Sequence, residues 1–373
     1  MRQIFICDTT LRDGEQAAGV AFSIEEKATI ARMLDEAGVY EIEAGTPVMG
    51  REEQEAVSCI TGLGLRARVL AWNRAVISDI DASIACGVSA VSISLPVSDL
   101  HMRHKLGRGR EWVLERLKAA VSYAKDKGLY VCAGAEDASR ADEGFLTEYG
   151  QAARSCGADR LRFADTVGVL DPFSTREKVT KLLKAVSLPV EVHVHNDFGL
   201  ATANALAGIK AGATCVGATV LGLGERAGNA ALEEVVMAAR HITGFDAGID
   251  VSRLVRLCAY VAKVSGRAIP AGKPIVGGCI FHHESGIHAD GVLKWPGTYE
   301  AYPPEEVGLS REIAIGKHSG RSGLIHRFGG MGIKLSSNEA SEMLMEVRCI
   351  SVGLKRGLSD AELLSLYKSR RQA

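Results

Sequence analysis

Pro189-Val190-Glu191-Val192-His193-Val194-His195-Asn196-Asp197 is the stretch that decides the fold, because it is a strand that ends in a pair of histidines. Its alternating, β-branched residues predict an extended segment in which His193 and His195 share one face with Glu191. Two neutral imidazoles on one face suit a divalent cation when a carboxylate joins them and a coordination position stays open. The pair is also compatible with two histidines that are merely hydrogen-bonded or exposed, so the surrounding pattern has to decide.

A unit of apolar strand, polar loop and amphipathic helix recurs from Ile4 to about Ile242. The predicted strands are residues 4–8, 40–44, 67–71, 90–94, 129–133, 160–164, 190–194 and 215–219. The predicted helices are residues 23–37, 51–61, 79–86, 111–127, 146–156, 175–186 and 201–211, and residues 229–242 close the set. Eight such units in roughly 240 residues predict an α/β fold, the closed (β/α)₈ TIM barrel.

Local signals agree with these boundaries. Ser23 and Glu26 form the capping box that opens the first helix. Glycines that suit a left-handed helix end precede the next strand at positions 38, 87, 128, 157 and 212. The main alternative, an open doubly wound sheet, more often has a glycine fingerprint after its first strand, where this chain has polar and charged residues 8–16. We therefore favour the barrel.

The regular alternation stops after Ile242, and a different organisation is expected from there on. A helix over residues 251–265 leads to a proline- and glycine-rich linker, 267–274, and then to a loop-rich stretch, 277–306. Three further helices are predicted over residues 319–328, 337–352 and 360–369. We divide the chain into a TIM-barrel catalytic domain, residues 1–263, and a small, mainly helical C-terminal appendage, residues 264–373, that acts as a lid and dimerisation region.

Composition excludes several classes of partner. The formal net charge is −1, so neither nucleic acid nor an anionic membrane is an expected partner. The nine cysteines are scattered without a Cys-x-x-Cys pair, which is typical of reduced thiols in a cytoplasmic protein. No stretch approaches the roughly 20 apolar residues of a membrane span, and the first residues are too short for a signal sequence.

The chemistry of such a barrel lies at the carboxyl ends of its strands, which collects residues that are far apart in sequence. Asp13, after the first strand, is either a loop carboxylate that caps a turn or the anionic third ligand beside His193 and His195. Two histidines and one carboxylate leave open positions that could chelate a bidentate substrate. Arg12 is either a structural ion-pair partner or a fixed positive charge that faces an oxygen gaining charge during reaction.

Three further segments admit more than one interpretation. The loop 222–229 only superficially resembles a dinucleotide fingerprint, since its glycine spacing is wrong, but it could receive an anion or a pantetheine-type chain. The segments 282–290 and 316–321 are dense in polar groups, yet their spacing fits no standard metal site, so they are better explained as segments that reach over an active site. Tyr299 belongs to the same lid or simply packs.

Three motifs, in residues 8–16, 193–201 and 222–229, resemble the signatures of the 2-isopropylmalate/homocitrate synthase (DRE-TIM metallolyase) family. These are acyl-CoA Claisen condensing enzymes on a metal-dependent TIM barrel. The resemblance runs through the barrel into residues 285–291, and within the family it is strongest to the homocitrate synthases of nitrogen fixation. It implies condensation of acetyl-CoA with 2-oxoglutarate and water to give homocitrate and CoA. The alternatives are 2-isopropylmalate or citramalate synthesis, a lyase or aldolase, and a non-catalytic metal-binding protein.

The resemblance also assigns roles to residues of this chain. It implies that Asp13, His193 and His195 bind a divalent cation (Mg²⁺, Mn²⁺ or Zn²⁺), with Asn229 near it. Arg12 would face the keto oxygen, Gln16, Glu43 and Thr166 would bind the 2-oxo acid, and Glu136 would assist proton transfer. His288, as the base, and Tyr299 would come from the partner subunit of a domain-swapped homodimer.

Two departures from the family pattern affect the identity of the acceptor. Lysine-pathway homocitrate synthases have an arginine where this chain has Cys132, and a histidine where it has Trp72-Asn73. Either the acceptor lacks a second carboxylate, or another cation binds that carboxylate. We favour the second explanation, with Arg74, His101 or Arg103 as the expected cations.

Overall fold

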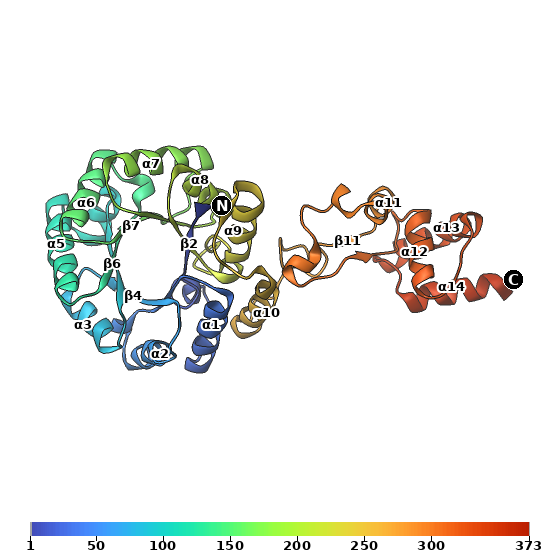
Figure 1. Cartoon of the computed structure of the whole chain (residues 1–373), viewed down its shortest axis with the longest axis horizontal. Helices are drawn as coiled ribbons and strands as arrows, with labels where there is room; N and C mark the ends of the chain where they lie inside the picture. Colours follow the sequence, from blue (N-terminus) through green and yellow to red (C-terminus); the bar gives the residue numbers. More distant parts are fainter. Residues whose placement is uncertain (1, 373) are drawn as a thin grey trace. The chain divides into compact units, whose positions relative to one another are not determined.

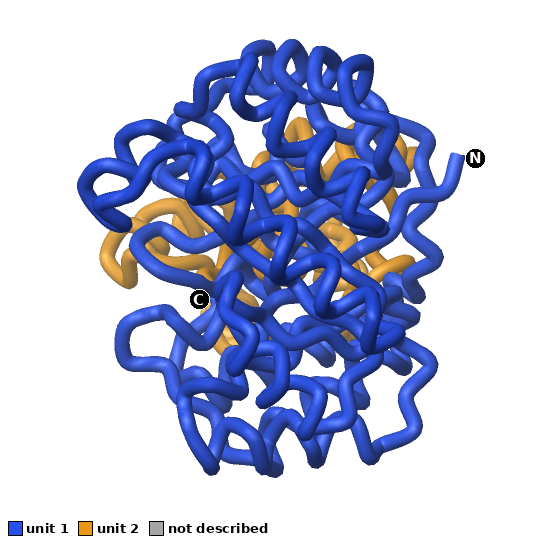
Figure 2. The backbone as a smooth tube through the Cα atoms, turned by 90° about the vertical axis from the view of Figure 1, so that its left-hand side faces the viewer, with its two compact units in different colours: residues 1–269 blue, residues 270–373 orange. Residues whose placement is uncertain are grey.

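The computed structural model describes residues 2–372. The chain forms two compact units, residues 1–269 and 270–373, drawn in different colours in Figure 2, and each is described by itself. None of the helices formed by residues 2–372 has the length and apolarity needed to cross a membrane.

The first unit is a closed barrel of eight parallel strands, which confirms the predicted TIM barrel (Figure 1). In barrel order the strands are β2 (Phe5–Asp8), β3 (Glu41–Gly45), β4 (Arg68–Arg74), β5 (Ala90–Pro96), β6 (Tyr130–Glu136), β7 (Arg160–Asp165), β8 (Val190–Val194) and β9 (Cys215–Ala218). Pairing of β2 with β9 closes the ring, which excludes the open doubly wound sheet. A short pair of strands, β1 (Arg2–Gln3) and β10 (Phe245–Asp246), joins the chain start to the segment after the barrel.

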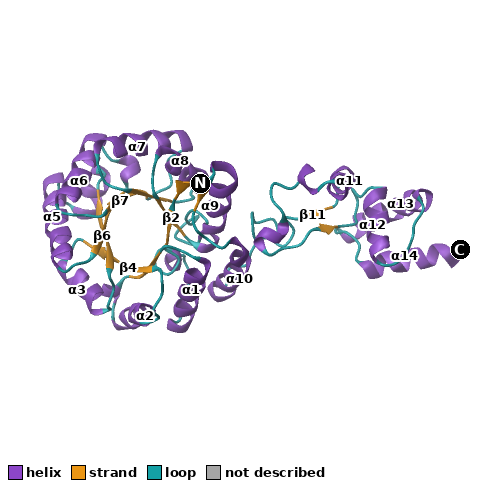
Figure 3. Cartoon of the chain, viewed as in Figure 1, coloured by secondary structure: helices purple, strands orange, loops and turns teal. Residues whose placement is uncertain are grey.

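Helices surround the barrel on its outer side (Figure 3). They are α1 (Ile24–Ala37), α2 (Arg51–Thr61), α3 (Ile77–Ala85), α4 (Asp99–His101), α5 (Arg110–Asp126), α6 (Glu143–Ser155), α7 (Pro172–Ala185), α8 (Ala201–Ala211), α9 (Leu232–Ala238) and α10 (Leu254–Ser265). The predicted capping box of Ser23 and Glu26 opens α1, and Gly38 ends it with a left-handed φ of 92°. Asp142 and Asp171 cap α6 and α7, so both helices begin earlier than predicted.

The barrel strands have a charged interior that the sequence analysis treated as apolar. Residues two apart on a strand share a face, so Glu41 with Glu43, and Arg160 with Arg162, point the same way. Seven residues of alternating charge form a continuous chain of ion pairs, with successive contacts of 2.5–3.0 Å. In order of contact this barrel ion network is Arg12, Glu43, Arg162, Glu191, Arg160, Glu41 and Arg68. Because each buried charge has an opposite partner, the interior tolerates these ions.

The predicted helix over residues 229–242 begins too early but ends within one residue of the observed helical segment. Helix α9 begins only at Leu232, because the preceding residues are extended and form isolated bridges, Asn229 with His195 and Ala231 with Thr219. Its α-helical part ends at Ala238, and a wider π-helical turn, Ala239–Thr243, continues the segment. The extended start places the Asn229 backbone next to His195 instead of on a helix.

The second unit is mainly helical, as predicted. Its elements are β11 (His282–His283), α11 (Gly286–Lys294), β12 (Glu312–Ile313), α12 (Arg321–Gly330), α13 (Ser337–Leu354) and α14 (Asp360–Gln372). A small core that includes Leu324, Phe328 and Val347 holds the helices together. The stretch predicted as loop-rich, 277–306, contains α11, which the sequence analysis missed because its glycines masked the helical pattern.

Candidate active site

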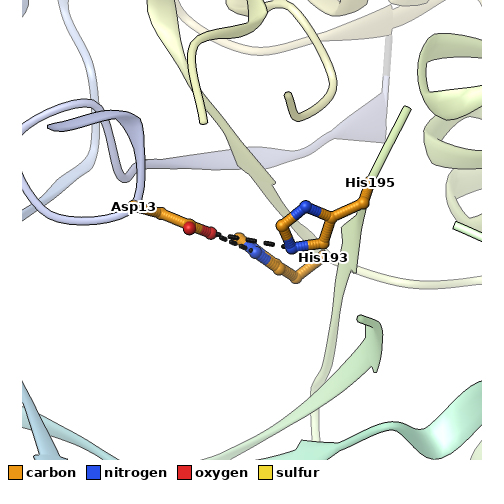
Figure 4. A group of neighbouring side chains, drawn as sticks. All are labelled: Asp13, His193 and His195. Atoms are coloured by element: carbon orange, nitrogen blue, oxygen red, sulfur yellow. Dashed lines mark hydrogen bonds and ion pairs between the residues drawn. The ribbon is translucent and has the colours of Figure 1, made fainter. Parts of the chain in front are cut away.

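Asp13, His193 and His195 converge at the carboxyl rim of the barrel (Figure 4). Asp13 Oδ2 is 2.8 Å from His193 Nε2 and 3.9 Å from His195 Nε2, although 180 residues separate the loop after β2 from β8. All three side chains are buried, and their ligand atoms lie within 4.8 Å of one another. Within residues 2–372 this is the one group of at least three His, Cys, Asp or Glu residues that could hold a metal ion.

The electrostatic setting favours a neutral imidazole and an ionised carboxylate. Burial and the neighbouring His193 lower the pKa of His195 to about 4, so its ring is neutral near pH 7. Burial opposes ionisation of Asp13, but Arg12 and the histidines outweigh it and hold the pKa of Asp13 well below its usual range. Neutral histidine and ionised aspartate are the protonation states that a metal ligand needs.

The surroundings of the three residues fit a cation. A Cβ atom on Gly217 would lie 2.5 Å from His193 Nδ1, so the histidine ring packs against bare backbone of β9 and is fixed in place. Asn229 donates through Nδ2 to the carbonyl of Leu223 (2.9 Å), while its buried Oδ1 has no partner among residues 2–372. Asn229 Oδ1 is therefore an oxygen that could serve as a further ligand beside the group.

Arg12 is held rigidly next to this group. Its Nε and Nη2 atoms contact Glu43 Oε2 at 2.8 and 2.7 Å, and its Nη1 lies 3.6 Å from Asp13 Oδ1. Burial opposes ionisation of Glu43, but Arg12 and Arg162 lower the pKa of Glu43 to about 2. Glu43 thus carries a full negative charge that fixes two arginines.

A cavity of about 240 Å³ opens above these residues. Its lining includes the predicted residues Arg12, Asp13, Gln16, Glu136, Thr166, His193 and His195. It also includes Trp72, Ser94, Lys105, Gly134, Arg162, Ala164, Glu225 and Arg226. The cavity therefore combines the candidate metal group with four cationic side chains, which suits a small anionic molecule.

Arg162 is the important lining residue that the sequence analysis did not single out. Its Nη1 is 3.0 Å from Glu43 Oε1 and its Nε is 2.6 Å from Glu191 Oε1. The signal that could have found it is its spacing, because on β7 it stands two residues from Arg160 and so faces the interior. In the strand register Arg162 lies opposite Gly134, next to the site of the unexpected Cys132.

Arg226 joins the loops that follow three strands. It has a left-handed φ of 57°, and its guanidinium contacts both oxygens of Asp197 (2.8 and 3.0 Å) and the carbonyl of Thr166 (2.7 Å). This contact ties the glycine-rich turn after β9 to the loops after β7 and β8. The turn is therefore part of the site wall, not a dinucleotide fingerprint.

Three predicted substrate-binding residues do not line the cavity. The Arg74 side chain is 60% exposed, and Asp79 holds its guanidinium through contacts of 2.7 and 3.0 Å. Arg103 is exposed on the π-helical turn Met102–Leu106, from which Lys105 reaches the cavity instead. Glu43 is fully buried beneath Arg12, so it orients that arginine and has no exposed surface for substrate.

His288 and Tyr299 belong to the second unit, where they form a pair. Their rings stack with centroids 4.1 Å apart, and both side chains are exposed in this single chain. A Cβ atom on Gly291 would lie 2.6 Å from the Tyr299 ring, so this glycine makes room for the tyrosine beside α11. His283, in the same unit, is paired with Glu300 (3.0 Å), which accounts for one of the tail histidines without a second metal site.

Comparison with known proteins adds sequence evidence to this geometry. A family model described as HMGL-like matches residues 3–261, and one described as homocitrate synthase post-HMGL domain-like matches residues 275–352. The chain is 56% identical to homocitrate synthase 1 of Nostoc sp., over 100% of this chain and 98% of that protein. It is 55% identical to 2-isopropylmalate synthase 2 of Caldanaerobacter subterraneus subsp. tengcongensis, over 98% and 96%. The HMG-CoA lyase of Bacillus subtilis shares the fold, with a TM-score of 0.66 at 19% identity, over 72% of this chain and 96% of that one.

Proposed function

The chain belongs to the HMGL-like family, in the DRE-TIM metallolyase branch of 2-isopropylmalate and homocitrate synthases, and on that premise we propose that it is a homocitrate synthase. As an acyltransferase of this kind it would convert acetyl-CoA, 2-oxoglutarate and water into homocitrate and CoA. The observation that carries the proposal is the buried group of Asp13, His193 and His195 beside the fixed charge of Arg12.

A divalent cation held by Asp13, His193 and His195, with Asn229 beside it, would polarise the ketone of the 2-oxo acid. Arg12 would offer a preorganised positive charge to the keto oxygen as that oxygen gains charge. Because Glu43 already fixes the guanidinium, little reorganisation would be needed when the charge develops.

The carbon nucleophile comes from the acetyl group. A thioester methyl is a weak acid, so its deprotonation needs an oriented base, for which we propose His288 with Tyr299 stacked on it. The methyl carbon then forms a bond to the ketone carbon, the former keto oxygen takes up a proton, and water cleaves the thioester to release CoA. Glu136, which lines the cavity, would assist these proton transfers.

We propose that His288 and Tyr299 reach the barrel site of a partner subunit in a domain-swapped homodimer. Their exposure in the single chain, together with that of Ile287 (75% exposed) and Trp295 (70% exposed) on the same segment, supports a surface that is covered on assembly.

Room for a second substrate exists next to the site. A cavity of about 630 Å³ shares Arg12 and Gln16 with the smaller one and is also lined by Phe22, Ile24 and Met49. Its partly apolar wall suits the pantetheine arm of acetyl-CoA.

The cationic side chains at the cavity bear on whether the 2-oxo acid acceptor has a second carboxylate. Cys132 is fully buried on β6, so the arginine expected there is absent, but Arg162 and Arg226 line the cavity. These charges support an acceptor with two carboxylates. The second candidate, 2-isopropylmalate synthesis, is favoured by the same Cys132 and by the 55% identical relative of that name.

A panel of 2-oxo acids tests the proposal. Purified protein with acetyl-CoA and Mg²⁺, Mn²⁺ or Zn²⁺ would be given 2-oxoglutarate, 2-oxoisovalerate or pyruvate, and free thiol would be followed. The fastest CoA release is expected with 2-oxoglutarate, and Asp13→Asn serves as the inactive control. Release with 2-oxoisovalerate or pyruvate, but none above the blank with 2-oxoglutarate, would show that the homocitrate assignment is wrong.

A further inference from the structure

Glu136, the last residue of β6, is held by one of its two carboxylate oxygens. Oε1 lies 3.1 Å from His101 Nδ1 and 2.6 Å from Lys105 Nζ, and the side chain is 16% exposed. Oε2 accepts no hydrogen bond from any group of residues 2–372. The carboxylate is therefore fixed at one oxygen and free at the other.

The tautomer of His101 follows from its other neighbour. Arg140 Nη2 lies 3.3 Å from His101 Nε2, and a guanidinium can only donate. With Nε2 as the acceptor from Arg140, Nδ1 is the ring nitrogen that donates to Glu136.

The Arg140 guanidinium is itself held by Asp137. Its Nε and Nη2 atoms donate to the carboxylate of Asp137 at 2.8 Å each, and Asp137 is fully buried. The Ser98 hydroxyl donates to the same carboxylate and accepts from the backbone N–H of His101, which secures the histidine backbone as well. The chain of contacts from Asp137 through Arg140 to His101 therefore ends on Glu136.

We propose that His101 and Lys105 are positioning residues that fix Glu136 Oε1, so that Oε2 is the oxygen that exchanges protons during catalysis. This inference rests on the proposed function, in which Glu136 assists proton transfer. It assigns a role to two residues of the loop after β5 that contact no reacting atom themselves. The contact with Glu136 also accounts for the position of Lys105 at the cavity, which Arg103, two residues earlier, does not line.

A double-mutant cycle tests the proposal with acetyl-CoA and 2-oxoglutarate as substrates. We expect His101→Leu and Lys105→Met each to lower kcat about tenfold, the effect of one lost charge-assisted hydrogen bond, with KM changed less than about twofold. His101→Asn should retain most of the activity, because its amide nitrogen can donate from the place of Nδ1. In a Glu136→Gln background the two substitutions should cost nothing further. Lys118→Met, at an exposed site on α5, is the matched control and should leave kcat unchanged.

Several outcomes would overturn the inference. Equal losses with and without the Glu136 carboxylate would show that the two residues do not act through it. A Lys105→Met variant that raises KM for 2-oxoglutarate at constant kcat would make the lysine a substrate ligand instead. A crystal structure of His101→Leu in which the Glu136 carboxylate has not moved would show that His101 does not position Glu136. This outcome remains informative even if wild-type protein proves inactive on every 2-oxo acid and the proposed function fails.

Discussion

Replacement of Glu43 by glutamine should destabilise the barrel far more than replacement of an exposed glutamate in an equally short ion pair. Glu43 is fully buried and neutralises Arg12 and Arg162, whose side chains are only 10% and 5% exposed. Its pKa falls from 4.5 to about 2 on folding, which corresponds to about 3 kcal/mol of stability. Loss of one partner from a buried ion pair costs about 3–5 kcal/mol, in agreement with that value.

The control is Glu55→Gln. Glu55 lies 2.7 Å from Arg51, but the two side chains are 51% and 90% exposed, so water screens this pair and it should contribute little to stability. Thermal unfolding of metal-free protein, followed by circular dichroism at pH 7.5, measures both variants. We expect the midpoint to fall by about 6–10 °C for Glu43→Gln and by about 1 °C or less for Glu55→Gln.

The stability contributed by Glu43 should also depend on pH. A lowered pKa gives stability that is present above the unfolded value of 4.5 and is lost as the pH falls through about 2. The difference between wild type and Glu43→Gln should therefore narrow as the pH is lowered below 4.5. Equal unfolding midpoints for Glu43→Gln and Glu55→Gln at pH 7.5 would refute the claim that the buried charge of Glu43 stabilises the barrel.

The remaining predictions concern the metal, the lid and a second buried carboxylate. Asp13→Asn should lose bound metal, measured by mass spectrometry, and become insensitive to chelators, whereas wild type at 100 times its metal Kd should lose about 2.7 kcal/mol of stability on chelation. His288→Ala should abolish CoA release but retain wild-type metal content. A 1:1 mixture of His288→Ala and Asp13→Asn, refolded together, should recover about a quarter of wild-type activity, since half of the dimers then have one intact site out of two. No recovery of activity would argue against a site shared between subunits. Burial raises the pKa of Asp8 to about 7, so Asp8 costs stability as the pH rises from about 4 to 7, and Asp8→Asn should be stabilising at pH 8 relative to wild type but not at pH 4. A stability difference that is the same at both pH values would contradict the shifted pKa.

The fold could be predicted from the sequence because local and periodic signals agreed. Strand β8 was predicted over residues 190–194, which are its observed bounds, and the capping box at Ser23 and the left-handed Gly38 set the limits of α1. The geometry of a barrel rim then brings Asp13 to the two histidines without any knowledge of side-chain detail.

The charged interior and the loop conformations could not be predicted in the same way. Arg160 and Arg162 were included in a strand that was treated as apolar, although their two-residue spacing places both inside the barrel. The π-helical turn Met102–Leu106 decides that Lys105, not Arg103, faces the cavity, and no sequence pattern used above predicts such a turn. Arg74 was expected at the acceptor, but Asp79, five residues later on the next helix, pairs with it.

The barrel ion network also constrains how this enzyme could be altered. Its charges alternate along a line that crosses several strands, so a single reversal at Glu43, Arg162 or Glu191 places two like charges in contact inside the protein. Variants that reverse the charge at one of these positions alone should therefore be destabilised more than the neutral variant Glu43→Gln. Libraries that exchange paired positions together, with the alternation preserved, are the ones from which a changed acceptor preference could be selected.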